Sequence, residues 1–215
     1  MKKIAVVLAG CGVYDGAEIH EATLTLLAIS QQGASYQCFA PDIDQAQVVN
    51  HLTGEEMNES RNVLVEAARI ARGNIKALNE YKASDYDAVI FPGGFGVAKN
   101  LCTFAFDGPD CSVNSEVEQA IRSAIVAGKP VGALCISPVL IAKVLGDVEV
   151  TIGQDIATAN AIEALGAKHV TTTHGEIVVD EKYKVITTPC YMLDANIRQI
   201  ADGANKVVAK LLEMA

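Results

Sequence analysis

An apolar run in this sequence ends at a cysteine, Cys135, and a helical pattern begins immediately after it. Residues 130–134 have the continuous apolar character of a strand buried on both faces, and residues 137–145 carry helical periodicity. Cys135 is therefore predicted to lie at a strand-to-helix corner, where the first amides of the helix point toward its sulfur and favour a thiolate over a thiol. Because hydrolases present a nucleophile on such a corner, Cys135 is the first candidate for covalent chemistry.

A second predicted strand, at residues 87–91, runs into a glycine-rich turn that ends at Gly96. The two adjacent glycines in this turn have no Cβ, so backbone amides there can approach a reacting oxygen closely. The carboxyl ends of parallel strands share one edge of a sheet, where ligands bind. We therefore expect an oxyanion-binding site formed by the amides of Gly94 and Ile136. The alternative for a Pro-Gly-Gly segment is an ordinary tight turn.

Acidic residues gather at the start of the first predicted helix. Such acids commonly interact with the helix dipole, and this role is expected for Asp15 and Glu18. Glu21 instead begins an apolar face that continues at Leu24, Leu27 and Ala28, so its side chain can point toward the carboxyl edge of the sheet. A carboxyl group beside a thiol is partly desolvated, which raises its pKa into a range suited to proton transfer.

Four histidines are possible bases, and no sequence spacing relates any of them to Cys135. They are His20 on the first helix, His51, His169 and His174. A solitary histidine is more often exposed or structurally satisfied than catalytic, and His20 is the nearest plausible neighbour of the cysteine.

The composition excludes several classes of protein. With 215 residues and 50% apolar content, the chain can bury the core of one domain, taken as residues 1–215. A net charge of −9 without a basic stripe argues against nucleic acid as a partner. The first apolar run has only six residues before it reaches Gly10, which is too short for the core of a signal peptide. The sequence has no run of about 18 or more apolar residues, so no membrane span is predicted.

The cysteines and glycines give no sign of a metal or nucleotide cofactor. The six cysteines have no Cys-x-x-Cys pair and no regular spacing to histidine, so a zinc site is not expected. The loop from Gly10 to Gly16 fails the dinucleotide-binding pattern, whose third glycine would have to replace Asp15. Scattered cysteines in a chain of this length suit a reducing compartment, and we expect a cytoplasmic protein.

Apolar runs and helical patterns alternate along the chain, which predicts an α/β fold with a doubly wound, mostly parallel sheet. The expected strands lie at 3–9, 35–40, 87–91, 130–134, 148–151, 176–180 and 184–187, and the expected helices near 17–32, 59–72, 115–127, 137–145, 155–165 and 192–213. Residues 41–86 are too long for a plain crossover and are interpreted as an insertion on the sheet edge. This insertion could cover the active site or contact another subunit.

Several segments together resemble the ThiJ/PfpI superfamily of amidotransferase-like proteins. They are the stretch from Phe91 to Leu101, the elbow from Ala133 to Pro138, and a first-helix glutamate, Glu21, placed twelve residues before Gly33. Within that superfamily the chain is similar to the ElbB group, through residues 10–21, 50–54, 61–64 and 66–70. The similarity extends over essentially the whole chain, the insertion included.

The resemblance implies a flavodoxin-like three-layer sandwich of the class I glutamine amidotransferase type, and a homodimer. It implies a nucleophilic cysteine hydrogen-bonded to a glutamate, which are Cys135 and Glu21 by motif position. The ElbB group implies conversion of glyoxal to glycolate without glutathione, metal or other cofactor, and a link to isoprenoid biosynthesis.

The chain departs from its relatives at the histidine of the catalytic triad. In related glyoxalases a histidine follows the strand after the elbow helix, but residues 150–155 here contain Gln154 and Asp155 instead. This departure weighs most against amidotransferase activity, because glutamine hydrolysis needs a base that delivers a proton to the leaving ammonia. We therefore expect a cofactor-independent glyoxalase that binds small α-oxoaldehydes as a hemithioacetal at Cys135. A non-enzymatic redox-sensing or interaction protein with a reactive Cys135, and a glutaminase-type amidotransferase subunit, stay open as alternatives.

Overall fold

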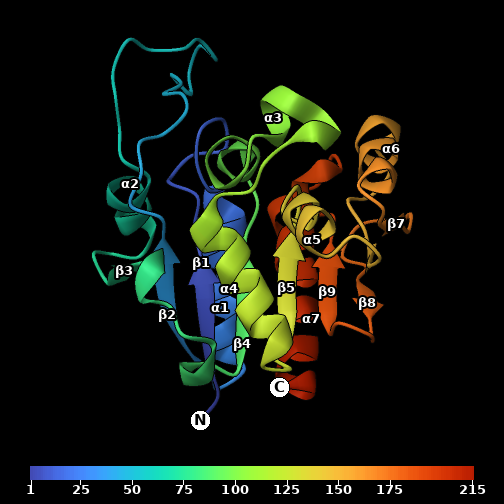
Figure 1. The fold of residues 1–215 in the computed structure, drawn as a ribbon. Coiled ribbons are helices and arrows are strands. Elements are labelled where there is room, and N and C mark those ends of the chain that lie inside the picture. The colour runs from blue at the N-terminus through green and yellow to red at the C-terminus, as the bar shows by residue number, and fades with distance from the viewer.

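The computed structural model describes residues 1–215 as a three-layer α/β sandwich around a seven-stranded sheet (Figure 1). The strand order is β3-β2-β1-β4-β5-β9-β8, and every neighbouring pair is parallel except β8 and β9. The strands are β1 (Lys3–Val7), β2 (Ser35–Ala40), β3 (Ile75–Ala77), β4 (Ala88–Phe91), β5 (Val131–Leu134), β8 (Val178–Asp180) and β9 (Val185–Thr188). The predicted fold class is confirmed.

Helices cover both faces of the sheet, as the unbroken apolar strands require. The helices are α1 (Ile19–Gln31), α2 (Val63–Ile70), α3 (Phe104–Asp107), α4 (Ser115–Val126), α5 (Pro138–Leu145), α6 (Ile156–Ala164) and α7 (Ile197–Met214). α1 and α7 pack against each other on one face, whereas α4 and α5 pack on the other (Figure 1). No helix is both long and apolar enough to span a bilayer.

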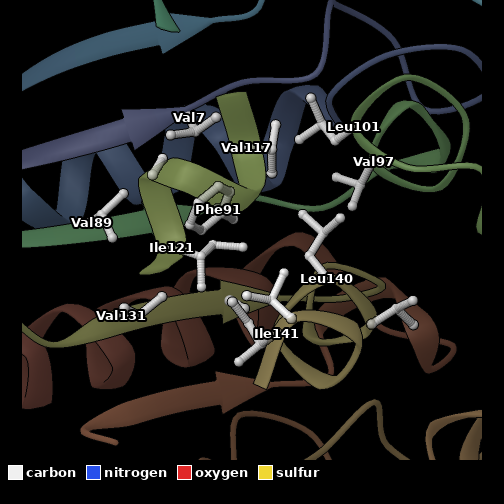
Figure 2. Packing of buried hydrophobic residues seen from close by; sticks show 14 of the residues in the cluster. Val7, Val89, Phe91, Val97, Leu101, Val117, Ile121, Val131, Leu140 and Ile141 are labelled. Atoms are coloured by element: carbon white, nitrogen blue, oxygen red, sulfur yellow. The ribbon is translucent and has the colours of Figure 1, made fainter. Parts of the chain in front are cut away.

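Two apolar cores, one on each face, fix the strands against the helices. Figure 2 shows Phe91 of β4 beside Ile121 of α4, with Leu140 and Ile141 of α5 next to them. All four side chains are almost completely buried. Because β4 and β5 end inside this packed layer, the loops that follow them start from fixed positions.

The strand order places the two predicted motifs side by side. The chain leaves β1 toward β2 and β3, then returns to add β4 on the other side of β1, so the direction of winding reverses between β1 and β4. Ligands of doubly wound sheets bind at the carboxyl ends of strands near such a reversal. Phe91 is in register with Ala133, so the glycine turn after β4 and Cys135 after β5 lie at the same edge.

The long connection from residue 41 to residue 86 divides into two parts. Residues 41–62 are irregular and held by isolated bridges, such as that between Val49 and Glu56. The rest forms α2, shorter than the predicted helix at 59–72, and β3, an edge strand parallel to β2 that the sequence did not indicate. The three residues of β3 are too few to show a periodic pattern, so β3 is defined only by its pairing with β2.

Two elements near the carboxyl terminus differ from expectation. The strand predicted at 148–151 is β6 (Glu149–Val150), which pairs with β7 (Lys168–His169) outside the main sheet. The closing helix begins at Ile197 rather than near residue 192, because Asn196 and Gln199 form a capping box that sets its first turn. A separate 3₁₀ turn, Cys190–Met192, is thereby left at the carboxyl end of β9.

Candidate active site

Cys135 stands on a sharp corner directly after β5. Its φ of +60° lies in the left-handed region that non-glycine residues rarely adopt. The corner is held by the Cys135 N–H, which donates to the carbonyl of Thr188 at 2.9 Å, and by the Ser137 hydroxyl, which donates to the carbonyl of Pro92 at 2.9 Å. A strained residue that its neighbours hold so firmly suggests a functional position.

The backbone amides of Gly94 and Ile136 both donate hydrogen bonds to the Cys135 sulfur. The structure thus brings together the two amides predicted to bind an oxyanion, although their role in binding one stays a prediction. Gly94 has a φ of +106°, and a Cβ there would lie 2.4 Å from the Gly16 carbonyl oxygen. Only glycine allows this amide to face the sulfur.

Glu21 reaches the cysteine from the first turn of α1. Its side chain is completely buried and hydrogen-bonded to the Cys135 sulfur. One carboxyl oxygen accepts from the Gly93 N–H at 3.0 Å, and the other accepts from the Tyr191 N–H at 3.2 Å. Glu18 caps α1 as predicted, accepting from the Glu21 N–H at 2.7 Å. Glu21 is therefore fixed on three sides.

Other expectations for this helix need correction. Leu27 is exposed, whereas Ala28 is buried and Leu24 is partly buried as predicted, and the buried face extends to Thr25. Asp15 does not interact with the helix dipole. It is buried and accepts a hydrogen bond from the Val49 N–H at 2.7 Å, so it anchors the irregular loop at 41–62.

Burial dominates the ionisation of the pair. The pKa of Glu21 is raised to about 8, first by desolvation and then by the nearby Glu18 carboxylate. Desolvation also raises the pKa of Cys135 well above its usual value, and a charged Glu21 raises it further. The expectation that the helix amides alone would make Cys135 a thiolate is wrong, because burial outweighs them. The pair instead shares protons, so the sulfur becomes a thiolate when Glu21 accepts its proton.

Each of the four histidines is bonded to another part of the chain. His20 Nδ1 pairs with the Tyr191 hydroxyl at 2.8 Å, His51 with the Val49 carbonyl and the Tyr14 N–H, His169 with the Ile152 N–H, and His174 with the Asp194 carbonyl. Gln154 and Asp155, at the place of the relatives' histidine, are exposed. The hydrogen-bond partners of the Cys135 sulfur are therefore Glu21 and two backbone amides, and no histidine is among them.

A cavity of about 370 Å³ opens beside the sulfur. Its walls come from loops and helices that follow five different strands, and none of its lining residues comes from 41–86. The lining is Val13, Glu18, Gly94, Phe95, Ala98, Phe104, Ala105, Cys135, Ile136, Asp155, Thr158, Tyr191 and Met192. Sequence reasoning missed Tyr191, whose amide holds Glu21, and the aromatic residues Phe95 and Phe104. Only the preceding motif Pro92-Gly-Gly drew attention to Phe95.

Gly93 makes the contact between Glu21 and Cys135 possible. A Cβ at Gly93 would lie 2.3 Å from the Cys135 Cβ and 2.6 Å from the Glu21 carboxyl oxygen. We expect Gly93→Ala to lower turnover of any substrate of this site about 100-fold, because displacing the pair by even 1 Å disrupts a reacting geometry. Steady-state kinetics measure the loss of turnover, and thermal unfolding measures any loss of stability.

Gly128→Ala is the matched control for Gly93→Ala. Gly128 ends α4 with a φ of +67° and has open space around its Cβ position. The Gly128→Ala substitution should lower the free energy of unfolding by about 1 kcal/mol and leave turnover unchanged. Equal activity of the Gly93 variant and the wild type would refute this account of the turn.

The chain is similar along nearly its whole length to named proteins. It is 52% identical over 222 residues to the human "Glutamine amidotransferase-like class 1 domain-containing protein 3, mitochondrial", with 99% of this chain and 83% of that protein covered. The zebrafish "ES1 protein, mitochondrial" is 37% identical, with 98% and 85% covered. This chain belongs to the amidotransferase-like ES1 family. No family model matches the sequence.

Solved structures agree with membership in the ES1 family. An isoprenoid biosynthesis protein with an amidotransferase-like domain from Ehrlichia chaffeensis is 35% identical, with a TM-score of 0.94 and 100% and 99% of the two chains covered. Members of the DJ-1/ThiJ/PfpI superfamily, such as Drosophila melanogaster DJ-1beta at 19% identity and a TM-score of 0.56, share the fold. This likeness shows a shared fold.

The expectation of a cytoplasmic protein is wrong. The ES1-family relatives from human, rat and zebrafish are all named as mitochondrial proteins. The expectation rested on six unpaired cysteines, which remain free in the structure. Free cysteines distinguish a reducing from an oxidising compartment, but they do not distinguish one reducing compartment from another.

Proposed function

We propose that this ES1-family chain is a cofactor-independent glyoxalase of the ElbB group, which converts small α-oxoaldehydes to 2-hydroxy acids. The observation that carries the proposal is the buried pair of Glu21 and Cys135, hydrogen-bonded to each other at the base of a cavity. A nucleophile, a proton carrier with a pKa near neutrality, and two amide donors together are the groups that such a reaction needs.

The first step forms a hemithioacetal. The ionised Glu21 carboxylate takes the thiol proton as the Cys135 sulfur adds to one aldehyde carbon of glyoxal. The C=O π bond becomes a lone pair on oxygen, and the amides of Gly94 and Ile136 are placed to stabilise that alkoxide. Glu21 then returns its proton to the alkoxide, which gives the neutral hemithioacetal and regenerates the carboxylate.

The second step moves a proton between the two carbons. The Glu21 carboxylate removes the C–H proton from the carbon bonded to sulfur, and the electron pair moves toward the neighbouring carbonyl to give an enediolate. Glu21 returns its proton to the other carbon while the hydroxyl proton of the first carbon passes to the enediolate oxygen, which gives a thioester of glycolate. Water hydrolyses the thioester, releasing glycolate and the free thiol, so glyoxal plus water becomes glycolate plus one proton without a change in the enzyme.

The proposal favours an aldehyde over an amide because of the groups at the sulfur. Cleaving glutamine requires a proton donor for the leaving ammonia, whereas the aldehyde reaction has no leaving group until the thioester stage. The histidine that supplies this proton in triads has no counterpart here, and the four histidines of the chain are hydrogen-bonded to groups other than Cys135 and Glu21. Incubation of the protein with glyoxal in the absence of glutathione should yield glycolate, detected by chromatography. No glycolate above the uncatalysed rate, or ammonia release from glutamine instead, contradicts the proposal.

The proposed reaction should depend on pH through the Glu21 and Cys135 pair. The reactive state has lost one proton from the pair, and the pKa of about 8 at Glu21 sets where that loss occurs. We expect kcat/KM for glyoxal to rise about tenfold per pH unit below 8 and to level off above it. A profile that is flat from pH 6 to pH 9 contradicts this assignment, and Glu21→Gln should abolish the rise.

The homodimer, the single domain over residues 1–215 and the link to isoprenoid biosynthesis stay predictions. The Ehrlichia chaffeensis structure carries an isoprenoid biosynthesis name, which supports placing the chain in the ElbB group. The small aldehyde is the proposed partner of the site.

A further inference from the structure

The cavity beside Cys135 is larger than glyoxal requires. Liquid water occupies about 30 Å³ per molecule, so at a similar share per atom a cavity of about 370 Å³ holds roughly a dozen non-hydrogen atoms. Glyoxal has four. A substrate that fills the cavity carries a substituent on the α-oxoaldehyde group.

The walls that would surround such a substituent are apolar. Nine of the thirteen lining residues are hydrophobic. Phe95 is 52% exposed although it directly follows the Gly94 amide at the sulfur, so a ligand in the cavity would cover aromatic surface that now faces water. Covering apolar surface is favourable by about 25 cal/mol per Å², and an aromatic ring gains further from contact with a second ring. Phe104 of α3 provides that second aromatic wall.

The charged groups of the cavity are acidic. Glu18 and Asp155 are the lining residues with carboxyl groups, and no lysine, arginine or histidine lines the cavity. Hydrogen bonds from Thr158 hold the pKa of Asp155 below its usual value, so it is a carboxylate at neutral pH. The Lys99 amine lies 5.6 Å from the centre of the Phe95 ring but does not line the cavity, and it donates to the Tyr14 carbonyl at 2.8 Å. A negative charge on the substrate would face like charges in a partly desolvated site.

We infer that the natural substrate is an uncharged α-oxoaldehyde with an apolar, ring-sized substituent, and that the cavity excludes α-oxoaldehydes whose substituent carries a carboxylate. The inference rests on the proposed function, and it assigns Phe95 to binding the substituent and Asp155 to rejecting anions. Phenylglyoxal, with ten non-hydrogen atoms, matches the cavity in size and character.

Three aldehydes test the inference on the full chain. We expect kcat/KM for phenylglyoxal to exceed that for glyoxal by at least about tenfold, and a para-carboxylate on the same ring to reduce it by at least about tenfold. The inference is overturned if kcat/KM for glyoxal equals that for phenylglyoxal, or if the para-carboxylate does not change kcat/KM for phenylglyoxal. Either result leaves the proposed function intact. Failure of all three aldehydes overturns the proposed function itself.

Two variants test the assigned residues. Phe95→Ala should lower the ratio of kcat/KM for phenylglyoxal to that for glyoxal several-fold, whereas Phe106→Ala should not change it, because Phe106 is exposed on α3 and does not line the cavity. Asp155→Asn keeps an acceptor for the Thr158 N–H at the start of α6. Asp155→Asn should reduce the difference in kcat/KM between phenylglyoxal and its para-carboxylated form. An unchanged difference in kcat/KM contradicts the role of Asp155.

Discussion

Replacing Cys135 with serine is expected to lower glycolate formation from glyoxal at least about 1,000-fold, since removal of a covalent nucleophile costs more than any other single change at such a site. Serine preserves the size of the side chain and the corner at φ +60°. Its hydroxyl is a far weaker nucleophile than a thiolate, and Glu21 does not compensate for that difference. Single-turnover assays with glyoxal, together with mass spectrometry for a thioester on Cys135, measure the loss.

Two further cysteines serve as controls for the Cys135 variant. Cys38 lies on β2 and Cys102 lies at the end of the π-helical turn at Val97–Leu101, and both are buried away from the cavity. Serine at either position should lower stability by leaving a polar group in an apolar core, with kcat/KM nearly unchanged in the folded fraction. Full activity of Cys135→Ser would show that the sulfur is not the nucleophile and would end the glyoxalase proposal.

Glu21→Gln is expected to gain stability relative to the wild type as the pH rises from 5 to 8. In the unfolded chain Glu21 ionises near pH 4.5, whereas in the folded protein it keeps its proton up to about pH 8. The folded state therefore binds one more proton between these values, and the contribution of Glu21 to the free energy of unfolding falls through that window. At 1.36 kcal/mol per pH unit, the fall amounts to about 5 kcal/mol.

Urea unfolding of both proteins from pH 5 to pH 9 measures this linkage as a difference between variants. The glutamine has one acceptor for the two amides of Gly93 and Tyr191, so a pH-independent cost of about 1–3 kcal/mol is expected at every pH. Glu118→Gln is the surface control, because its pair with Arg122 is exposed and contributes at most about 1 kcal/mol. If the difference in the free energy of unfolding between Glu21→Gln and the wild type stays constant with pH, Glu21 is not a buried carboxyl of raised pKa.

The sequence predicted the parts of the site whose signals are local. The apolar runs before Cys135 and before Pro92 identify two buried strands, because a strand covered on both faces has no polar alternation. A nucleophile corner and a glycine turn each occupy a few consecutive residues. Since parallel strands expose their carboxyl ends at one edge, the meeting of these motifs followed from the fold class alone.

Only the packing of α1 and α7 decided how Glu21 reaches the sulfur. Of the apolar face inferred from Leu24, Leu27 and Ala28, only Leu27 is exposed, so helical periodicity located the buried side of α1 but not its edge. Glu21 points inward because Gly93 leaves space for its carboxyl and because the Tyr191 N–H, 170 residues away in the sequence, donates a hydrogen bond to that carboxyl. No sequence pattern connects residues at such a separation.

The ionisation of the pair and the shape of the cavity also belong to the tertiary structure. The sequence placed Cys135 at a helix start and so favoured a thiolate, but burial and the Glu21 charge raise its pKa, and desolvation depends on every segment that excludes water. The cavity walls come from Phe95, Phe104, Asp155 and Tyr191, which lie in three separate connections. The sequence by itself thus determined the fold class and predicted the reactive atom, because both depend on short-range patterns. The tertiary structure decided the protonation and the substrate space, because these depend on long-range packing.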